Sequence, residues 1–211
     1  MKIICYGDSN TYGYDPHGGM LLRYDAAGRW VDLVGNTLPE SCKIFNAGQN
    51  GREIPDNGWE SAEGVAMQLA AATEPGCAGG KQDLIIIMLG SNDVLLDGLS
   101  AEKTAMKMKR FLGAVKMEAP GRQILIIAPV SFRKGYWVPD QRYIEESEKL
   151  PGLYEQLACE MDVYFADANE WGVSLTDDGV HFMEEGHKAF AEGLTKQLKL
   201  WYSIRRPPSA I

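Results

Sequence analysis

The apolar residues of the chain follow two alternating patterns. Five short runs are apolar on nearly every residue, and between them apolar residues recur at helical spacing. The runs are Lys2 to Tyr6, Lys43 to Asn46, Asp83 to Leu89, Gln123 to Val130 and Val163 to Ala166. This alternation predicts a three-layer α/β/α domain, because consecutive apolar residues are typical of parallel strands covered by helices on both faces.

Three of the intervening segments carry helical stripes of apolar residues. The stripes are Trp30, Leu33, Val34 and Leu38 in the first gap, Ala101, Ala105, Met108, Leu112 and Val115 in the third, and Phe190, Leu194, Leu198 and Trp201 near the end. This spacing predicts helices with one buried face and makes Trp30 a packing residue. The stretch from Arg133 to Leu150 is interpreted as a long loop at the carboxyl end of the fourth strand, the edge where open α/β sheets bind ligands.

Length and charge narrow the class of protein. With 211 residues, 45% of them hydrophobic, the chain is long enough for one well-buried core. We therefore expect a single domain over residues 1–204, followed by a short C-terminal tail over residues 205–211. The formal net charge of -8 argues against a nucleic-acid partner, which requires clustered Lys and Arg. A small molecule is the expected partner, and the sequence leaves open whether the chain forms a homo-oligomer.

Cysteine spacing and the N-terminus bear on the cellular compartment. The four cysteines, Cys5, Cys42, Cys77 and Cys159, lie far apart and show neither CxxC nor metal-ligand spacing. The N-terminus runs into the first strand without the regions of a signal peptide, and no run approaches the roughly 18 apolar residues of a membrane span. We expect reduced thiols, a cytoplasmic location and no membrane association.

A serine, Ser9, follows the first strand in the segment GDSNT. A serine hydroxyl is a weak nucleophile, and it reacts only with a base in hydrogen-bond reach, an acid that orients the base, and donors for the oxyanion. His181, in DDGVHF before the last helix, is a candidate base, and Asp178 can curl back onto its ring across a glycine. One histidine with flexible carboxylates falls short of a metal-ligand set, so no metal is expected.

Two further polar segments end strands at the same edge. Gly51 lies in NAGQNG beyond the second strand, and Asn92 lies in GSND at the end of the third. The carboxyl ends of neighbouring parallel strands meet at one rim, so these segments are expected to gather with Ser9 and His181 around one cleft.

Each of these residues, taken alone, has a simpler structural explanation. A serine after a strand is most often a helix N-cap, and Gly51 alone is usually a turn glycine. His187 is interpreted as a surface residue of the last helix, and His17 as a loop residue. Asp8 and Asp93 are interpreted as scaffold groups that hydrogen-bond loop amides. The joint pattern outweighs the separate explanations.

Together the segments resemble the sequence blocks of the SGNH, or GDSL-type, hydrolases. GDSN, NAGQNG, GSND and DGVH match those blocks in order over essentially the whole chain, and DLIIIMLGSND with DGVHF is similar to a branch of arylesterases and acyltransferases. The resemblance implies a flavodoxin-like, five-stranded parallel sheet of order 2-1-3-4-5. It implies that Ser9 is the nucleophile and His181 the base oriented by Asp178. The implied oxyanion hole consists of the backbone N–H groups of Ser9 and Gly51 and the side chain of Asn92.

The activity implied by the resemblance is hydrolysis or transfer of small acyl groups through a serine ester, without a cofactor. Short-chain, aryl and acetylated-sugar esters all fit this chemistry. Asp8, Tyr12 and Trp137 are the candidate substrate-binding residues, and Asn10 stands where leucine is commoner, at a position with no catalytic role. The alternative is a non-catalytic flavodoxin-like domain that binds a ligand at its first strand-to-helix turn. It is disfavoured because GxxxxGKS/T and GxGxxG are both absent.

Overall fold

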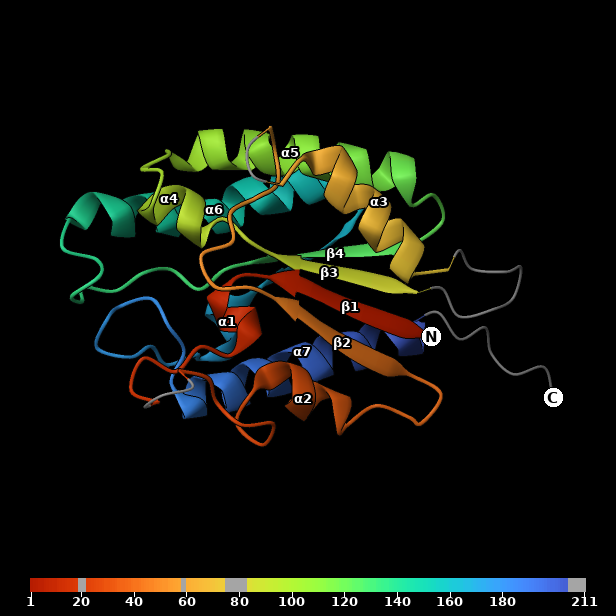
Figure 1. The fold of residues 1–211 in the computed structure, drawn as a ribbon, viewed down its shortest axis with the longest axis horizontal. Coiled ribbons are helices and arrows are strands. Elements are labelled where there is room, and N and C mark those ends of the chain that lie inside the picture. Colours follow the sequence, from red (N-terminus) through yellow and green to blue (C-terminus); the bar gives the residue numbers. More distant parts are fainter. Residues whose placement is uncertain (19–21, 58–59, 75–82, 205–211) are drawn as a thin grey trace.

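The sheet has the strand order that the resemblance to the SGNH hydrolases implies. A computed structural model describes residues 1–18, 22–57, 60–74 and 83–204 (Figure 1). Its strands are β1 (Lys2–Gly7), β2 (Lys43–Gly48), β3 (Leu84–Met88), β4 (Gln123–Ala128) and β5 (Tyr164–Asp167). They pair in parallel in the order β2-β1-β3-β4-β5, which confirms the flavodoxin-like prediction.

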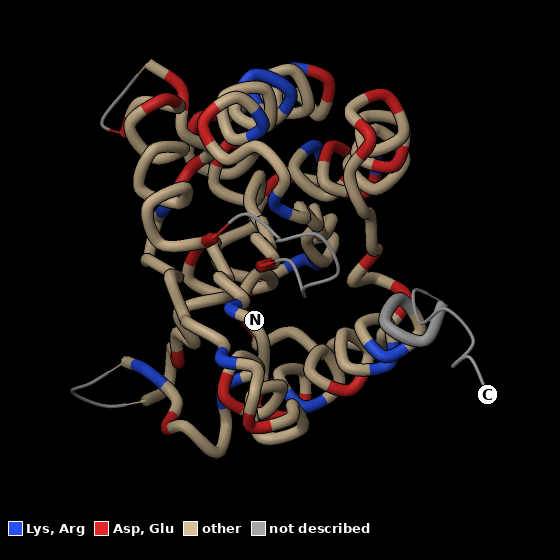
Figure 2. Tube along the Cα trace, turned by 90° about the vertical axis from the view of Figure 1, so that its right-hand side faces the viewer, with Lys and Arg blue, Asp and Glu red and all other residues tan. Residues whose placement is uncertain are grey.

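Helices cover both faces of this sheet. They are α1 (Ser9–Tyr12), α2 (Trp30–Gly35), α3 (Ala62–Ala72), α4 (Ser91–Leu95), α5 (Ala101–Glu118), α6 (Gln141–Met161) and α7 (Glu184–Ile204), with a 3-10 turn, η1, at Ala168–Trp171. Figure 1 shows α3, α5 and α6 on one face and α2 and α7 on the other. Figure 2 shows Lys and Arg interspersed with Asp and Glu along these helices.

The two cores follow from the two-residue period of the strands. In β1, Ile4 and Tyr6 pack with α3, α5 and α6, whereas Ile3 and Cys5 pack with α2 and α7. Trp30 is fully buried in the second core, with its ring centroid 4.6 Å from that of Phe190, so its interpretation as a packing residue is confirmed. Within the described residues, no helix combines the length and apolar character needed to cross a membrane. Residues 205–211, read as a tail, lie outside the described part of the chain.

Two expectations about local structure were wrong. The stretch from Arg133 to Leu150 is a loop only in its first part, because α6 begins at Gln141. The Asp140 carboxylate caps that helix by accepting the N–H of Arg142, and Leu150 is buried against the core. His187, expected on the surface of α7, is 0% exposed, because its ring packs between Tyr24 and Phe182.

Candidate active site

Ser9 is the first residue of α1, directly beyond the carboxyl end of β1. The helix is capped by Asp8, whose Oδ1 accepts the N–H of Asn10 at 3.0 Å. The interpretation of Ser9 as the N-cap is therefore wrong. The turn requires glycine at Gly7, because a Cβ there would lie 2.1 Å from Thr11 Oγ1. The result is a buried serine on a one-turn helix at the edge of the sheet.

The structure brings Ser9, His181 and Asp178 into one hydrogen-bonded chain. Ser9 Oγ lies 3.0 Å from His181 Nε2, and His181 Nδ1 lies 2.6 Å from Asp178 Oδ2. The other carboxylate oxygen of Asp178 accepts the N–H groups of Val180 at 2.8 Å and His181 at 2.9 Å. Gly179 makes this turn with φ +85°, and a Cβ there would lie 2.1 Å from the Arg133 carbonyl oxygen.

The pKa values of Asp178 and Asp8 are shifted in opposite directions. Burial alone would raise the pKa of Asp178, but hydrogen bonds from the His181 ring and from two backbone N–H groups lower it to about 2. Burial raises the pKa of Asp8 to about 6, against the hydrogen bond from the N–H of Asn10. Asp178 is therefore ionised at neutral pH. Its carboxylate favours the tautomer of His181 with the proton on Nδ1, which leaves the Nε2 lone pair facing Ser9 Oγ.

Asn92 and Gly51 flank Ser9 because of the strand order. β1 lies between β2 and β3, so the segment after β2, with Gly51, and α4 after β3, with Asn92, lie on either side of α1. Asn92 Nδ2 donates to the carbonyl oxygen of Arg52 at 2.9 Å. Gly51 precedes that residue with φ +71°. Asn92 is thus hydrogen-bonded to the segment that carries the Gly51 N–H group.

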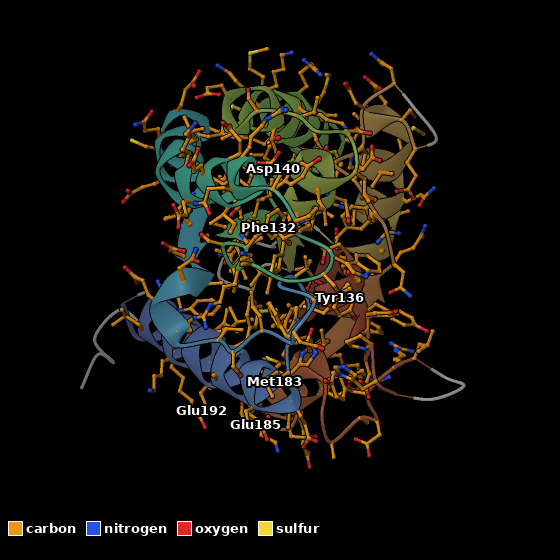
Figure 3. The ribbon with its side chains drawn as sticks, turned by 90° about the vertical axis from the view of Figure 1, so that its left-hand side faces the viewer. Phe132, Tyr136, Asp140, Met183, Glu185 and Glu192 are labelled. Atoms are coloured by element: carbon orange, nitrogen blue, oxygen red, sulfur yellow. The ribbon has the colours of Figure 1, made fainter. Side chains whose placement is uncertain are left out.

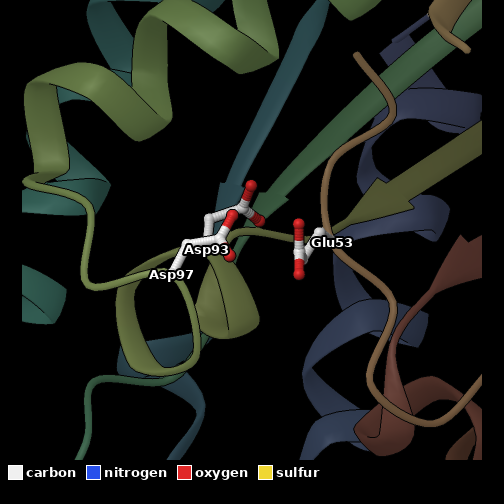
Figure 4. Close-up of side chains that lie close together, drawn as sticks. All are labelled: Glu53, Asp93 and Asp97. Carbon is white, nitrogen blue, oxygen red and sulfur yellow. The ribbon is translucent and has the colours of Figure 1, made fainter. Parts of the chain in front are cut away.

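An acidic cluster adjoins Asn92. The carboxylates of Glu53, Asp93 and Asp97 lie close together (Figure 4), and the ammonium of Lys107 lies among them. Its Nζ lies 2.7 Å from Asp93 Oδ1 and 3.3 Å from Glu53 Oε2. Asp93 also accepts the N–H of Ile54 at 3.0 Å. This confirms the scaffold interpretation of Asp93, whereas the role of Lys107 was missed, because nothing in the pattern of α5 distinguishes that lysine from its neighbours.

Two aromatic rings lie against the buried ring of His181. The ring centroids of Tyr14 and Trp137 lie 4.6 Å and 5.3 Å from that of His181. Trp137 is 44% exposed and belongs to the loop between β4 and α6, whose residues Phe132, Tyr136 and Asp140 are labelled in Figure 3. This view faces the carboxyl edge of the sheet.

The other two candidate substrate-binding residues are placed differently. The Arg23 guanidinium covers the ring of Tyr12, with its central carbon 4.0 Å from the ring centroid. Asp8 is buried and caps α1, which favours a scaffold role over contact with substrate. His17, interpreted as a loop residue, is exposed, and its Nε2 lies 3.1 Å from Asp177 Oδ1.

Asn10 has contacts that the sequence did not reveal. Its side chain accepts the N–H of Phe182 at 2.9 Å and donates to the carbonyl oxygen of Val180 at 3.1 Å. In the sequence, only one feature pointed to this residue: asparagine stands where leucine is commoner in the SGNH hydrolases.

Known proteins share the fold of this chain and part of its sequence. The profile of the GDSL-like lipase/acylhydrolase family matches residues 5–189. No curated protein sequence is a significant match. A structure of a putative arylesterase from Agrobacterium tumefaciens is 29% identical, with a TM-score of 0.77, and the match covers 94% of this chain and 98% of that one.

Two further solved structures have the same fold. A carbohydrate acetylesterase family member from Sinorhizobium meliloti is 27% identical with a TM-score of 0.80, over 96% of this chain and 99% of that one. The aryl esterase of M. smegmatis is 24% identical with a TM-score of 0.75, over 94% and 98% of the two chains. Because the family match spans most of its length, this chain belongs to the GDSL-like lipase/acylhydrolase family.

Proposed function

We propose that the protein is a serine esterase that acts on small acyl esters. The observation that carries this proposal is the buried chain from Ser9 Oγ through the His181 ring to the Asp178 carboxylate. His181 Nε2 accepts the Ser9 proton while Oγ attacks the ester carbonyl carbon, and the Asp178 carboxylate stabilises the imidazolium that forms. His181 then donates this proton to the leaving alcohol.

The second half of the reaction uses the same groups in reverse. Water, deprotonated by His181, attacks the acyl group on Ser9; the bond to Oγ then breaks, the acid leaves, and His181 returns the proton to Ser9 Oγ. An alcohol in place of water gives acyl transfer through the same residues. In both halves the oxyanion accepts hydrogen bonds from the N–H groups of Ser9 and Gly51 and from Asn92 Nδ2.

The cleft walls favour small or polar esters. Trp137 and Tyr14 place flat rings beside His181, and the same loops carry the charged side chains of Arg133 and Asp15. Among the described residues, these walls mix aromatic rings with charged groups, which suits a small or polar ester better than a long acyl chain. The names of the similar structures, an arylesterase and a carbohydrate acetylesterase family member, support the same substrate class.

The first turn disfavours the alternative of a phosphate- or flavin-binding domain. In such domains the phosphate lies at the N-terminus of the first helix, where backbone N–H groups point at it. Here the Asp8 side chain takes that place and accepts the N–H of Asn10. A buried carboxyl group at this position competes directly with an anion.

Ser9→Ala tests the proposal. The wild-type protein should hydrolyse p-nitrophenyl acetate and gain the mass of one fluorophosphonate adduct, and Ser9→Ala should do neither while keeping its unfolding midpoint. Ser131→Ala is the matched control, because Ser131 also follows a strand at the same edge of the sheet, beyond β4. Hydrolysis or labelling retained in Ser9→Ala would refute the assignment and revive the binding-domain alternative.

A further inference from the structure

The Asn10 side chain connects the helix of the nucleophile to both neighbours of the base. Its Oδ1 accepts the N–H of Phe182, and its Nδ2 donates to the carbonyl oxygen of Val180. These two residues stand on either side of His181. Asn10 itself stands next to Ser9, so one buried amide, 5% exposed, joins the two halves of the proposed catalytic pair.

Asn10 is itself held in place by other groups. Its backbone N–H donates to Asp8 Oδ1 at 3.0 Å, and its carbonyl oxygen accepts the indole N–H of Trp30 at 2.9 Å. Trp30 is fully buried in the core between the sheet, α2 and α7. The backbone of Asn10 is therefore held in place, and its side-chain amide in turn holds the backbone of the turn that contains His181.

The bonds of Asn10 complete the constraints on His181. The N–H of His181 donates to Asp178 Oδ1, and its ring nitrogen Nδ1 faces Asp178 Oδ2. Those contacts lie within one turn and orient the ring relative to Asp178 only. The Asn10 bonds, across 170 and 172 residues of sequence, tie the backbone of this turn to α1, beside the contact between the Ser9 and His181 side chains themselves.

We infer that Asn10 is a positioning residue for catalysis: it sets the distance between His181 Nε2 and Ser9 Oγ by holding the backbone on both sides of His181. This inference rests on the proposed esterase function. The site needs an amide because one partner is a donor and the other an acceptor. A leucine of similar size offers neither group.

Asn10→Leu tests the role of the amide in the reaction. The kcat for p-nitrophenyl acetate and the rate constant of fluorophosphonate labelling should both fall about tenfold to a hundredfold, because small misplacements of catalytic groups are costly. The KM should stay within about twofold, since Asn10 is buried and does not face the substrate. If Asn10→Leu does not fold, Asn10→Ala removes the same bonds without a branched side chain. It should show the same lowered kcat and labelling rate with a nearly unchanged KM.

Asn169→Leu is the matched control. Asn169 brackets Val130 with the same pair of bonds, accepting the N–H of Ser131 at 2.8 Å and donating to the carbonyl oxygen of Pro129 at 3.3 Å. The variant therefore loses the same pair of bonds, from an exposed side chain and at a turn without His181, and its kcat should stay within about twofold of wild type. A folded Asn10 variant with wild-type kcat and labelling rate, or an equal loss in Asn169→Leu, would overturn the inference.

A measurement without substrate separates this inference from the proposed function. Amide hydrogen exchange at Phe182 should be faster in the Asn10 variants than in wild type and unchanged in Asn169→Leu. If the wild-type protein hydrolyses no ester and takes no label, the proposed function is refuted, and the catalytic role of Asn10 is refuted with it. This holds even if hydrogen exchange shows that Asn10 holds the backbone at Phe182. If wild type is active but Phe182 exchange is unchanged in the folded Asn10 variants, only the positioning role is overturned.

Discussion

The ammonium nitrogen of Lys107 lies 2.7 Å from Asp93 Oδ1, and Asp93 directly follows Asn92 in α4. Asp93 is 0% exposed and also accepts the N–H of Ile54. Burial raises the pKa of Asp93, and the Lys107 ammonium opposes that rise. Asp93 therefore connects Lys107 of α5 with the backbone of Ile54, in the segment that follows Gly51 on the proposed oxyanion side of the cleft.

We expect Lys107→Met to lower the free energy of unfolding by about 3–5 kcal/mol, because it leaves the Asp93 carboxylate buried without its cation. Urea denaturation at pH 7 measures this loss. Lys149→Met is the control, since Lys149 and Glu146 form a pair of similar length, 2.8 Å, in which the lysine is half exposed. That variant should lose at most about 1 kcal/mol. Equal losses in the two variants would contradict a special role for the Lys107–Asp93 pair.

We expect Asp178→Asn to lower kcat on the order of 10⁴-fold, because an amide does not stabilise the imidazolium and no longer fixes its tautomer. Steady-state kinetics with p-nitrophenyl acetate measures the loss. Asp177→Asn is the matched control, because its carboxylate is exposed and contacts His17. It should keep most activity, and comparable losses at both aspartates would show that the orienting acid is misassigned.

We expect Asn92→Ala to lower kcat about a hundredfold to a thousandfold, the usual cost of one oxyanion donor, with little change in KM. The same assay separates the two constants. Asn50→Ala, at an exposed asparagine beside Gly51, should retain wild-type kcat. A rise in KM alone in Asn92→Ala would indicate that Asn92 binds the substrate rather than the oxyanion.

Stability in acid should depend on His187. Burial lowers its pKa to about 3, with smaller contributions from the positive charges of Arg29 and His181. In the unfolded chain a histidine takes up a proton near pH 6.5, so the stability associated with neutral His187 is present above that pH and is lost as the pH falls towards 3.

We therefore expect His187→Asn to show a smaller loss of unfolding free energy than wild type between pH 6.5 and pH 4. Asparagine does not titrate in this pH range. It also keeps an acceptor for the backbone N–H of Trp30, whose nitrogen lies 3.5 Å from His187 Nδ1. His17→Asn should keep the wild-type slope, because His17 is exposed. A wild-type slope in His187→Asn would be inconsistent with a buried, neutral histidine.

We expect the protein to prefer short acyl chains. Each methylene contributes at most about 0.8 kcal/mol, and only where the pocket encloses it. With Trp137 and Tyr14 beside His181, we expect kcat/KM for p-nitrophenyl esters to be highest from acetyl to butyryl and to fall for longer chains. An optimum at octanoyl or beyond would contradict the small-acyl proposal and favour a lipase.

The sequence by itself determined the sheet and the approximate place of the site. The apolar runs that became β1 to β5 are dense enough to specify buried parallel strands, whose carboxyl ends share one edge. The segments with Ser9 and Asn92 follow such strands directly, and the segment with His181 precedes α7. Their convergence follows from local pattern and from the resemblance of the segments to known sequence blocks.

The tertiary structure decided which groups act on one another. The burial of His187, the hydrogen bonds of Asn10 to the turn of His181 and the pairing of Lys107 with Asp93 involve residues far apart in sequence. Hydrophobic periodicity reports only which face of a local element is buried. It contains no information on which distant partner satisfies a polar group on that face, and those partners are what hold the proposed catalytic groups in position.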